Sequence, residues 1–447
     1  QCRLDGATPQ VFAVNKPYFR QTDSGAARQL IISGQGFGTT PGKVVLGSQT
    51  IQSGFTGSTW TDSQITLAVP AASGSFNGPQ QLTVIGSNNQ SSVNGLTVHI
   101  LNGTYNPTLY EAGPGKTYGT IQAAVTAAST GNNINNRKAL VVVYPGTVTP
   151  VNPKGVYYEN IVISRPIKLQ GVGPGGVRSN NTYVPGSILD GLGYEQINAG
   201  PWTTLVTGLN RAGNQQIYDG AVVTVYAPAT PSSAFTDARN RNFNAAIDGL
   251  TIQGGDQLGN PNKVNSLPNG GVALTQGGGI FVNGYAGYLQ ITNNVIQSNG
   301  GSYGGAIRVG TAYVGDNHNY NLHIGSNRIL ANGGTNLGGS IALFTGSNGY
   351  EVDHNDICGN YSAEYGGGIS HYGLSPNGKI HNNRIYFNSS YDEGAGVFIA
   401  GELPANPNNL SAGAGTVDIY ANQIQDNLAN DDGGGIRFLM AGTAQMH

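Results

Sequence analysis

The sequence predicts an all-β protein in which a small β-sandwich precedes a long parallel β-helix. Three observations favour this fold. Glycine makes up 70 of the 447 residues, and a chain so rich in turn residues is expected to join many short strands. Short alternating apolar runs fill the first segment of the chain. A single apolar-and-amide pattern then recurs throughout the second half, which is the signature of a solenoid.

The first segment, residues 1–101, is predicted to form the sandwich. Its alternating runs include Gln29–Ser33, Gln64–Val69 and Leu96–Ile100, and turns rich in Gly, Ser and Asn separate them. This spacing is typical of antiparallel sandwiches. Residues 102–116 are predicted to be a linker, and residues 117–447 are assigned to the β-helix.

Four elements of the first segment occur in an order that resembles the TIG/IPT family. They are Pro9–Val14, Ile32–Gly38, Trp60–Ile65 and Val69–Pro70. The resemblance covers almost the whole segment and implies an immunoglobulin-like β-sandwich. In secreted bacterial proteins such modules act as spacers or binding modules, so the resemblance implies no catalysis.

A short amphipathic helix is predicted at the start of the β-helix. Its apolar positions follow helical spacing and are Ile121, Ala124, Val125 and Ala128. Apolar strands follow at Leu140–Val143 and Ile161–Ile163. This succession resembles the N-terminal cap and first coils of pectin methylesterases and pectate-lyase-like proteins, which implies a right-handed helix. An open solenoid end exposes backbone and apolar layers, so we expect the α-helix to cover it.

Five copies of the repeat define the coils. Each begins with an apolar residue, has Asn three and eight residues later, and closes with Gly-Gly-x-Ile or a close variant. The first positions are Ile291, Ile324, Val352, Ile380 and Ile419. Stacked coils would repeat each side chain every ~4.8 Å, so we expect an apolar core and structural Asn ladders. Asn is also expected to take the left-handed backbone of the turns. The Gly-Gly-x-Ile element resembles repeats of chlamydial-type polymorphic surface proteins.

Carboxylates recur at one position in three successive copies. Glu364, Asp392 and Asp431 each stand five residues before the third-strand Ile or Val, and they are the candidate catalytic residues. Stacking would separate them by about 5 and 10 Å, a range that includes the carboxylate separations of glycosidases. The next column contains Glu393 and Asp432, which are candidate calcium ligands. The alternative is that these are merely solvated turn residues.

Three further residues are predicted to bind substrate. Tyr365 belongs to the second acidic column, while Phe398 and Arg437 fall in a column expected to point outward. An aromatic face and a guanidinium there would hold an acidic or neutral sugar. His371 falls in the inward column, and we expect a hydrogen-bonded core residue rather than a catalytic base.

The two cysteines do not form a disulfide framework. Cys2 and Cys358 lie at opposite ends of the domain order, so we do not expect them to pair. Cys358 is predicted to be a small buried apolar side chain. No run of 18 apolar residues occurs, and hence no membrane span is expected. With 10% charged residues and a net charge of -2, nothing favours nucleic acid as a partner.

The leading functional hypothesis is a secreted, extracellular or cell-surface scaffold of adhesin type that binds a polysaccharide or another surface glycan. The alternative is a secreted polysaccharide lyase or glycoside hydrolase that acts on a cell-wall or matrix polysaccharide. The sequence lacks the downstream aspartate and arginine motifs of pectin methylesterases and the lyase signatures. No cofactor other than calcium is expected. The coil through Ile436 has no capping sequence, which predicts a covering partner, self-association or a longer chain.

Overall fold

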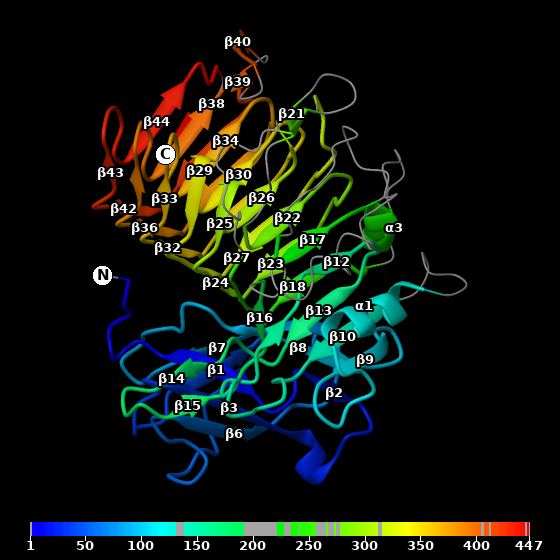
Figure 1. Ribbon diagram of the computed structural model, residues 1–447. Coiled ribbons are helices and arrows are strands. Elements are labelled where there is room, and N and C mark those ends of the chain that lie inside the picture. The colour runs from blue at the N-terminus through cyan, green and yellow to red at the C-terminus, as the bar shows by residue number, and fades with distance from the viewer. Residues whose placement is uncertain are drawn as a thin grey trace.

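A stack of short strands dominates the protein, and a smaller N-terminal module lies against its first coils (Figure 1). The computed structural model describes residues 2–130, 138–191, 221–227, 234–240, 242–255, 265–266, 272–273, 278–311, 315–403, 406–410, 413–442 and 445–446. Within these ranges no helix has the length and apolar character needed to cross a bilayer. The all-β prediction is confirmed.

Two small sheets form the N-terminal module. The first is antiparallel and contains β1 (Gln10–Val14), β3 (Gln29–Gln35) and β6 (Gln64–Ala68). The second contains, in order, β2 (Tyr18–Arg20), β8 (Leu96–Leu101), β7 (Gly78–Ile85), β4 (Lys43–Leu46) and β5 (Gln49–Ile51). A 3-10 turn, η1 (Gly25–Arg28), precedes β3. Apolar side chains from both sheets, such as Leu30 and Leu82, form one buried core.

Four parallel sheets make up the coils, and we number them 1 to 4. Sheet 1 contains β9 (Thr108–Ala112), β10 (Ala139–Val143), β13 (Lys168–Gly171), β18 (Ala246–Asp248), β23 (Gln290–Thr292), β27 (His323–Gly325), β31 (Glu351–Asp353), β35 (Gly378–His381), β41 (Val417–Tyr420) and β45 (Gln445–Met446). Sheet 2 contains β11 (Tyr157–Tyr158), β16 (Ile188–Asp190), β19 (Thr251–Gln253), β24 (Val295–Gln297), β28 (Arg328–Leu330), β32 (Asp356–Cys358), β36 (Arg384–Tyr386) and β42 (Gln423–Gln425).

The other two sheets follow the same order along the chain. Sheet 3 contains β12 (Ile161–Ile163), β17 (Val223–Val225), β22 (Ile280–Val282), β26 (Ile307–Val309), β30 (Ile341–Leu343), β34 (Ile369–Tyr372), β38 (Val397–Ala400) and β44 (Ile436–Leu439). Sheet 4 contains β25 (Gly300–Tyr303), β29 (Gly333–Leu337), β33 (Tyr361–Ser362), β37 (Ser389–Ser390) and β43 (Leu428–Ala429). The remaining elements are α3 (Ala234–Asn240) and the pairs β14 (Gly176–Val177) with β15 (Tyr183–Val184), β20 (Asn265–Ser266) with β21 (Val272–Ala273), and β39 (Glu402–Leu403) with β40 (Asn406–Leu410).

The predicted capping helix is present as α1 (Ile121–Ser129). All four residues of its predicted apolar stripe are buried, and the helix contacts strands β9, β10 and β12 of the first coil. Its first turn is capped twice. The Thr120 side chain accepts a hydrogen bond from the Ala123 N–H, and both Glu159 carboxylate oxygens accept N–H groups of the first turn at 2.9 Å. An acidic side chain at a helix N-terminus is favourable, so a coil residue fixes the cap in place.

The segment predicted as a linker instead contributes a strand to the solenoid. Strand β9 pairs in parallel with β10 over its whole length, from Thr108 beside Ala139 to Ala112 beside Val143. Leu109 also packs on an apolar cluster that joins the module to sheet 1. The turn residues around Asn102 suggested a linker, but only six residues separate the end of β8 at Leu101 from the start of β9 at Thr108.

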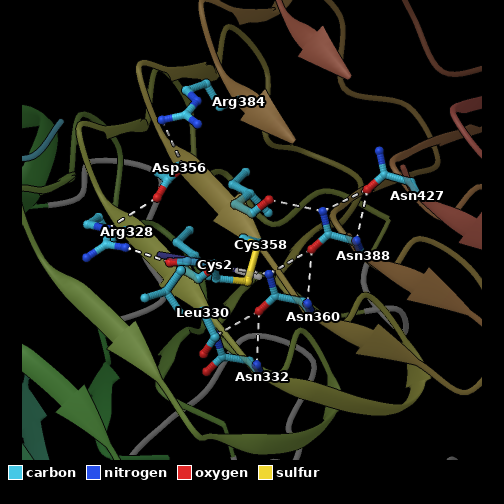
Figure 2. Close-up of a disulfide and its surroundings, with 12 residues drawn as sticks. Cys2, Arg328, Leu330, Asn332, Asp356, Cys358, Asn360, Arg384, Asn388 and Asn427 are labelled. Atoms are coloured by element: carbon cyan, nitrogen blue, oxygen red, sulfur yellow. Dashed lines mark hydrogen bonds and ion pairs between the residues drawn. A yellow bond between two sulfur atoms is a disulfide. The ribbon is translucent and has the colours of Figure 1, made fainter. Parts of the chain in front are cut away.

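The repeat stacks as predicted. The first-strand apolar residues form one column in register, and all are buried. The Asn residues form two ladders in which each Nδ2 donates to the Oδ1 of the next coil at 2.9 to 3.2 Å. Figure 2 shows part of one ladder, from Asn332 through Asn360 and Asn388 to Asn427.

The backbone role predicted for the ladder Asn is wrong. In the first ladder, the left-handed residue is the one immediately before each Asn, with φ between 53° and 58°. These residues are Asn293, Ser326, His354, Asn382 and Ala421. Four residue types share this position, so the turn does not select its occupant strictly. The ladder Asn is required for its side chain, which is buried between coils and satisfies backbone groups on both sides.

Cys2 and Cys358 form a disulfide, contrary to the prediction. Their Cα atoms lie 5.6 Å apart although 356 positions separate them in the sequence. Cys358 is buried in β32 as expected, and the N-terminal segment runs along the solenoid to reach it (Figures 1 and 2). Arg328 of the neighbouring rung also donates a hydrogen bond to the Cys2 carbonyl at 3.1 Å.

The module is docked onto sheet 1 through buried polar contacts. Asp248 is 2% exposed, and its carboxylate accepts five hydrogen bonds of 2.6 to 3.0 Å. The donors are the Thr97 N–H and hydroxyl of β8, together with Gln170, Thr292 and Asn293 of the solenoid. His99 of β8 also contacts Gln170 at 2.8 Å. The module and first coils therefore share one polar junction.

Candidate functional site

The three candidate catalytic carboxylates lie on successive rungs. The Asp392 N–H donates to the Glu364 carbonyl at 3.0 Å, and the Asp431 N–H donates to the Asp392 carbonyl at 3.1 Å. Strands β34, β38 and β44 fix this register, because Ile369, Val397 and Ile436 are aligned. Glu364 and Asp431 are exposed and Asp392 is half-buried. We call Glu364, Asp392 and Asp431 the acidic edge.

The two residues predicted to bind calcium are held by an arginine instead. Arg437 donates through Nε to Glu393 at 2.9 Å, and its Nη2 lies 3.4 Å from Asp432. Among the described residues, no group of three or more His, Cys, Asp or Glu side chains is placed to hold a metal ion. Arg437 therefore acts here as the counter-ion of Glu393 and Asp432, and calcium binding by these two residues stays a prediction.

Phe398 is not available to a sugar. It was predicted to point outward into solvent, but it is fully buried in a second apolar cluster outside the solenoid core. Tyr365 stacks on it, with ring centroids 4.8 Å apart and planes at 8°. Tyr372 also contacts the Phe398 ring. This aromatic group packs one coil against the next, so the assignment of Phe398 as an exposed sugar contact is wrong.

The glycine before each third strand explains why the outward column is covered. Gly394 has φ 65°, and a Cβ there would lie 2.7 Å from Cδ2 of Phe398. A Cβ at Gly366, which has φ 69°, would similarly lie 2.9 Å from the Cβ of Ser370. The left-handed glycine thus folds the turn back over the side chain four residues later. The same spacing occurs at Gly433 and Arg437, yet the Arg437 side chain remains 32% exposed, so the spacing alone does not predict burial.

Two exposed tyrosines accompany the acidic edge, and sequence reasoning missed them. Tyr361 is 45% exposed and Tyr391 is 65% exposed. The Tyr391 N–H donates to the Ser362 carbonyl, which places Tyr391 on the rung of Asp392 and directly above the rung of Tyr361 and Glu364. Exposed aromatic faces beside carboxylate acceptors suit the C–H faces and hydroxyl groups of a sugar. Aligning the repeats would not have revealed this pair, because Tyr361 aligns with Ser389 and Tyr391 aligns with Ala363.

His371 occupies the core position expected for it. Its Nδ1 lies 2.9 Å from the Tyr350 hydroxyl, and Nε2 lies within hydrogen-bonding distance of the carbonyls of Gly373 and Ala414. Burial lowers the pKa of His371 to about 4. The imidazole is therefore neutral at pH 7 and bonded on both nitrogens, and the expectation of a core residue is confirmed.

A cluster of histidines and carboxylates on sheet 1 was not anticipated. Asp353 bonds to His323 on one rung and to His354 of its own turn. His381 of the next rung contacts Glu351 at 2.9 Å. Although burial opposes ionisation, bonds to the two histidines hold the pKa of Asp353 below its usual value. Burial also opposes the charge on His381, yet its hydrogen bonds to Asn382 and Glu351 raise the His381 pKa. His323, Asp353 and His381 lie in three different copies and meet only by stacking.

Comparison with known proteins does not assign an activity. No protein-family model matches the chain, and no curated protein is significantly similar to it.

Proposed function

We propose that the protein is an extracellular or cell-surface scaffold that binds a glycan along the acidic edge. The observation that carries this proposal is the pair of exposed tyrosines, Tyr361 and Tyr391, on the same two rungs as Glu364 and Asp392. Tyr361 pairs with Ser389, so the two tyrosines are offset by two residues along the edge as well as by one rung. Their exposed rings offer aromatic faces to a sugar, and the carboxylates accept hydrogen bonds from hydroxyl groups. The surface favours an extended neutral chain.

Location outside the cytoplasm is supported by the disulfide. Disulfides persist in oxidising compartments and are rare in reducing ones. The Cys2–Cys358 bond ties the N-terminal segment to a strand far along the solenoid. Together with the buried Asp248 junction, it joins module and coils into one body. A stiff body that presents one edge to solvent suits a scaffold.

The finer family relationships form part of this proposal. We interpret the N-terminal sandwich as a TIG/IPT-type module, which agrees with its two small sheets and the buried Trp60. We interpret the coils as a right-handed solenoid of the pectate-lyase-like and polymorphic-surface-protein type. The capping helix α1 and the stacked Gly-Gly-x-Ile turns support this interpretation.

The test is a glycan array followed by titration calorimetry on the full chain. We expect Tyr391→Ala to weaken binding of the best neutral glycan by about two- to tenfold, because an aromatic contact contributes roughly 0.5–1.5 kcal/mol. Tyr158→Ala is the matched control, since Tyr158 is an exposed tyrosine on the first coil. The Tyr158→Ala variant should bind the same glycan with the affinity of the unmodified protein.

Two results would overturn the proposal. The first is the absence of any glycan ligand, or a Tyr391→Ala variant that binds as tightly as the unmodified protein. The second is turnover of a polysaccharide that Asp392→Asn abolishes. That result would establish the alternative, a lyase or glycoside hydrolase that uses the acidic edge. Reducing-end and unsaturated-product assays on the array hits distinguish binding from cleavage.

A further inference from the structure

A cleft lies between the N-terminal module and sheet 2, away from the elements that form the acidic edge. Its walls are β1, the β14–β15 hairpin and the outer face of strands β19, β24 and β28. Two adjoining hollows of about 290 and 540 Å³ share Gln10, Val177, Arg328 and Leu330. The N-terminal segment from Cys2 to Leu4 walls the second hollow, and the disulfide holds it there (Figure 2).

The charged side chains that line this cleft in the described part of the chain are all positive. Among the described residues, its lining contains Arg3, Lys154, Arg178 and Arg328 but no Asp or Glu. The whole chain, by contrast, has 21 Lys and Arg against 23 Asp and Glu. A concave surface lined by one sign of charge concentrates its field and attracts ligands of opposite sign.

Three of the four cations retain uncompensated charge. Among the described residues, Arg178 donates only to neutral backbone carbonyls, those of Gly34 at 2.9 Å and Ser63 at 3.2 Å. Arg3 and Lys154 are exposed, and within the described part of the chain neither side chain makes an ion pair. Arg328 is the exception, because Asp356 lies 3.2 Å from its Nε.

A buried hydrogen-bond donor without a partner also lines the cleft. Asn94 is 3% exposed, and its Nδ2 has no acceptor among the described residues. An unsatisfied buried amide is costly, roughly 1–3 kcal/mol, unless something supplies an acceptor. The neighbouring Gln297 donates to Gln253 at 3.2 Å, so further side-chain amides are held in fixed positions on the solenoid wall.

We propose that this cleft binds an acidic oligosaccharide through carboxylate or sulfate groups on its sugar units. The cations attract the acidic groups, Asn94 and the glutamines bond to sugar oxygens, and apolar residues such as Val177 and Leu330 contact the ring faces. The module thereby forms one wall of a second site, distinct from the proposed neutral-glycan edge.

The experiment is titration calorimetry of the full chain with three tetrasaccharides. One carries carboxylates (tetragalacturonate), one carries sulfates (a heparin-derived tetramer) and one is neutral (cellotetraose). We expect at least one acidic probe to bind, with an affinity that falls as salt rises, and cellotetraose to bind this cleft at least tenfold more weakly. The acidic probe that binds identifies the anionic group.

Charge reversal locates the site. The double variant Arg3→Glu and Lys154→Glu should weaken acidic-probe binding at least tenfold at unchanged melting temperature. Lys379→Glu is the control, because Lys379 is an exposed lysine on sheet 1 and outside the cleft. Tyr391→Ala should leave acidic binding intact, which separates this proposal from the neutral-glycan one. No acidic probe binding, equal loss in the control, or loss in Tyr391→Ala would overturn it.

Discussion

The coils and the junction with the N-terminal module are held together in opposite ways. In the coils one contact is repeated, so that each ladder Asn bonds its neighbours at nearly the same distance. At the junction each hydrogen bond occurs once. The single carboxylate of Asp248 accepts hydrogen bonds from the module and from two coils. When one of many equivalent contacts in the coils is lost, the similar contacts on the other rungs remain. A contact that occurs once, as at the junction, cannot be replaced by another. The two regions should therefore respond differently to equally conservative substitutions.

The largest effect is expected at the junction. Asp248→Asn keeps the shape but leaves a single acceptor oxygen for five donors, and it brings an amide N–H toward groups that themselves donate. We expect a loss of about 3–5 kcal/mol in unfolding free energy, measured by urea denaturation at pH 7. Asp426→Asn in an exposed coil turn is the control and should change stability by less than about 0.5 kcal/mol. A loss below about 1 kcal/mol for Asp248→Asn would contradict the unique role of the junction.

Removing the disulfide should have the next largest effect. The double variant Cys2→Ser and Cys358→Ser frees a chain closure that spans 356 positions. We expect a loss of about 2–4 kcal/mol, chiefly because the unfolded chain gains freedom. Scanning calorimetry with and without dithiothreitol measures this loss. The unmodified protein should fall to the stability of the variant on reduction, while the variant should not respond. Equal melting temperatures in both states would refute the expectation.

A ladder substitution in the middle of the coils should cost less. Asn355→Ala removes bonds to Asn327 and Asn383, and we expect a loss of about 1–3 kcal/mol. Asn422→Ala, near the half-buried end of the same ladder, should cost less because water reaches its neighbours. Urea midpoints of the two variants test this gradient. Equal losses at both positions would show that solvent access does not decide the cost of a ladder substitution.

The smallest expected effect is a pH dependence that compares the two regions directly. Burial lowers the pKa of His99 at the junction to about 3 and that of His371 in the coils to about 4. The unfolded chain binds protons below its usual pKa of 6.5 while the folded protein does not, so stability falls as pH falls. From about pH 6.5 to about 5.5 we expect a loss of about 1 kcal/mol per histidine.

Single substitutions separate the two contributions. His99→Gln and His371→Gln should each remove a similar part of the slope of unfolding free energy against pH. If the module and coils unfold together, a single unfolding transition should show the pH dependence due to both His99 and His371. Two separate unfolding transitions, each with the pH dependence of only one of the two histidines, would show that the junction does not couple the regions.

The repeating part of the protein could be predicted from the sequence. The first-strand column of Ile and Val, the Asn ladders and the amphipathic helix α1 all follow from spacing within one copy. The same spacing placed Glu364, Asp392 and Asp431 on successive rungs. Such inferences succeed because each depends on local periodicity, and stacking multiplies a local pattern without adding new information.

The site environment could not be predicted in the same way. Phe398 was expected to be exposed because alternation along a strand separates inward from outward positions, but alternation does not report what covers the outward face. Its burial depends on the turn at Gly394 and on Tyr365. Likewise, Arg437 was assigned to a sugar although two acidic neighbours already hold it.

The sequence by itself determined the coil, its repeat and its rung order, because these arise from the period of apolar and amide side chains. Only the tertiary structure decided that Cys2 meets Cys358, that β9 joins the solenoid, and that the module encloses a basic cleft. These contacts join residues far apart in the chain and occur once each. No repeating pattern in the sequence encodes these contacts, because they form only when distant parts of the chain come together in the folded protein.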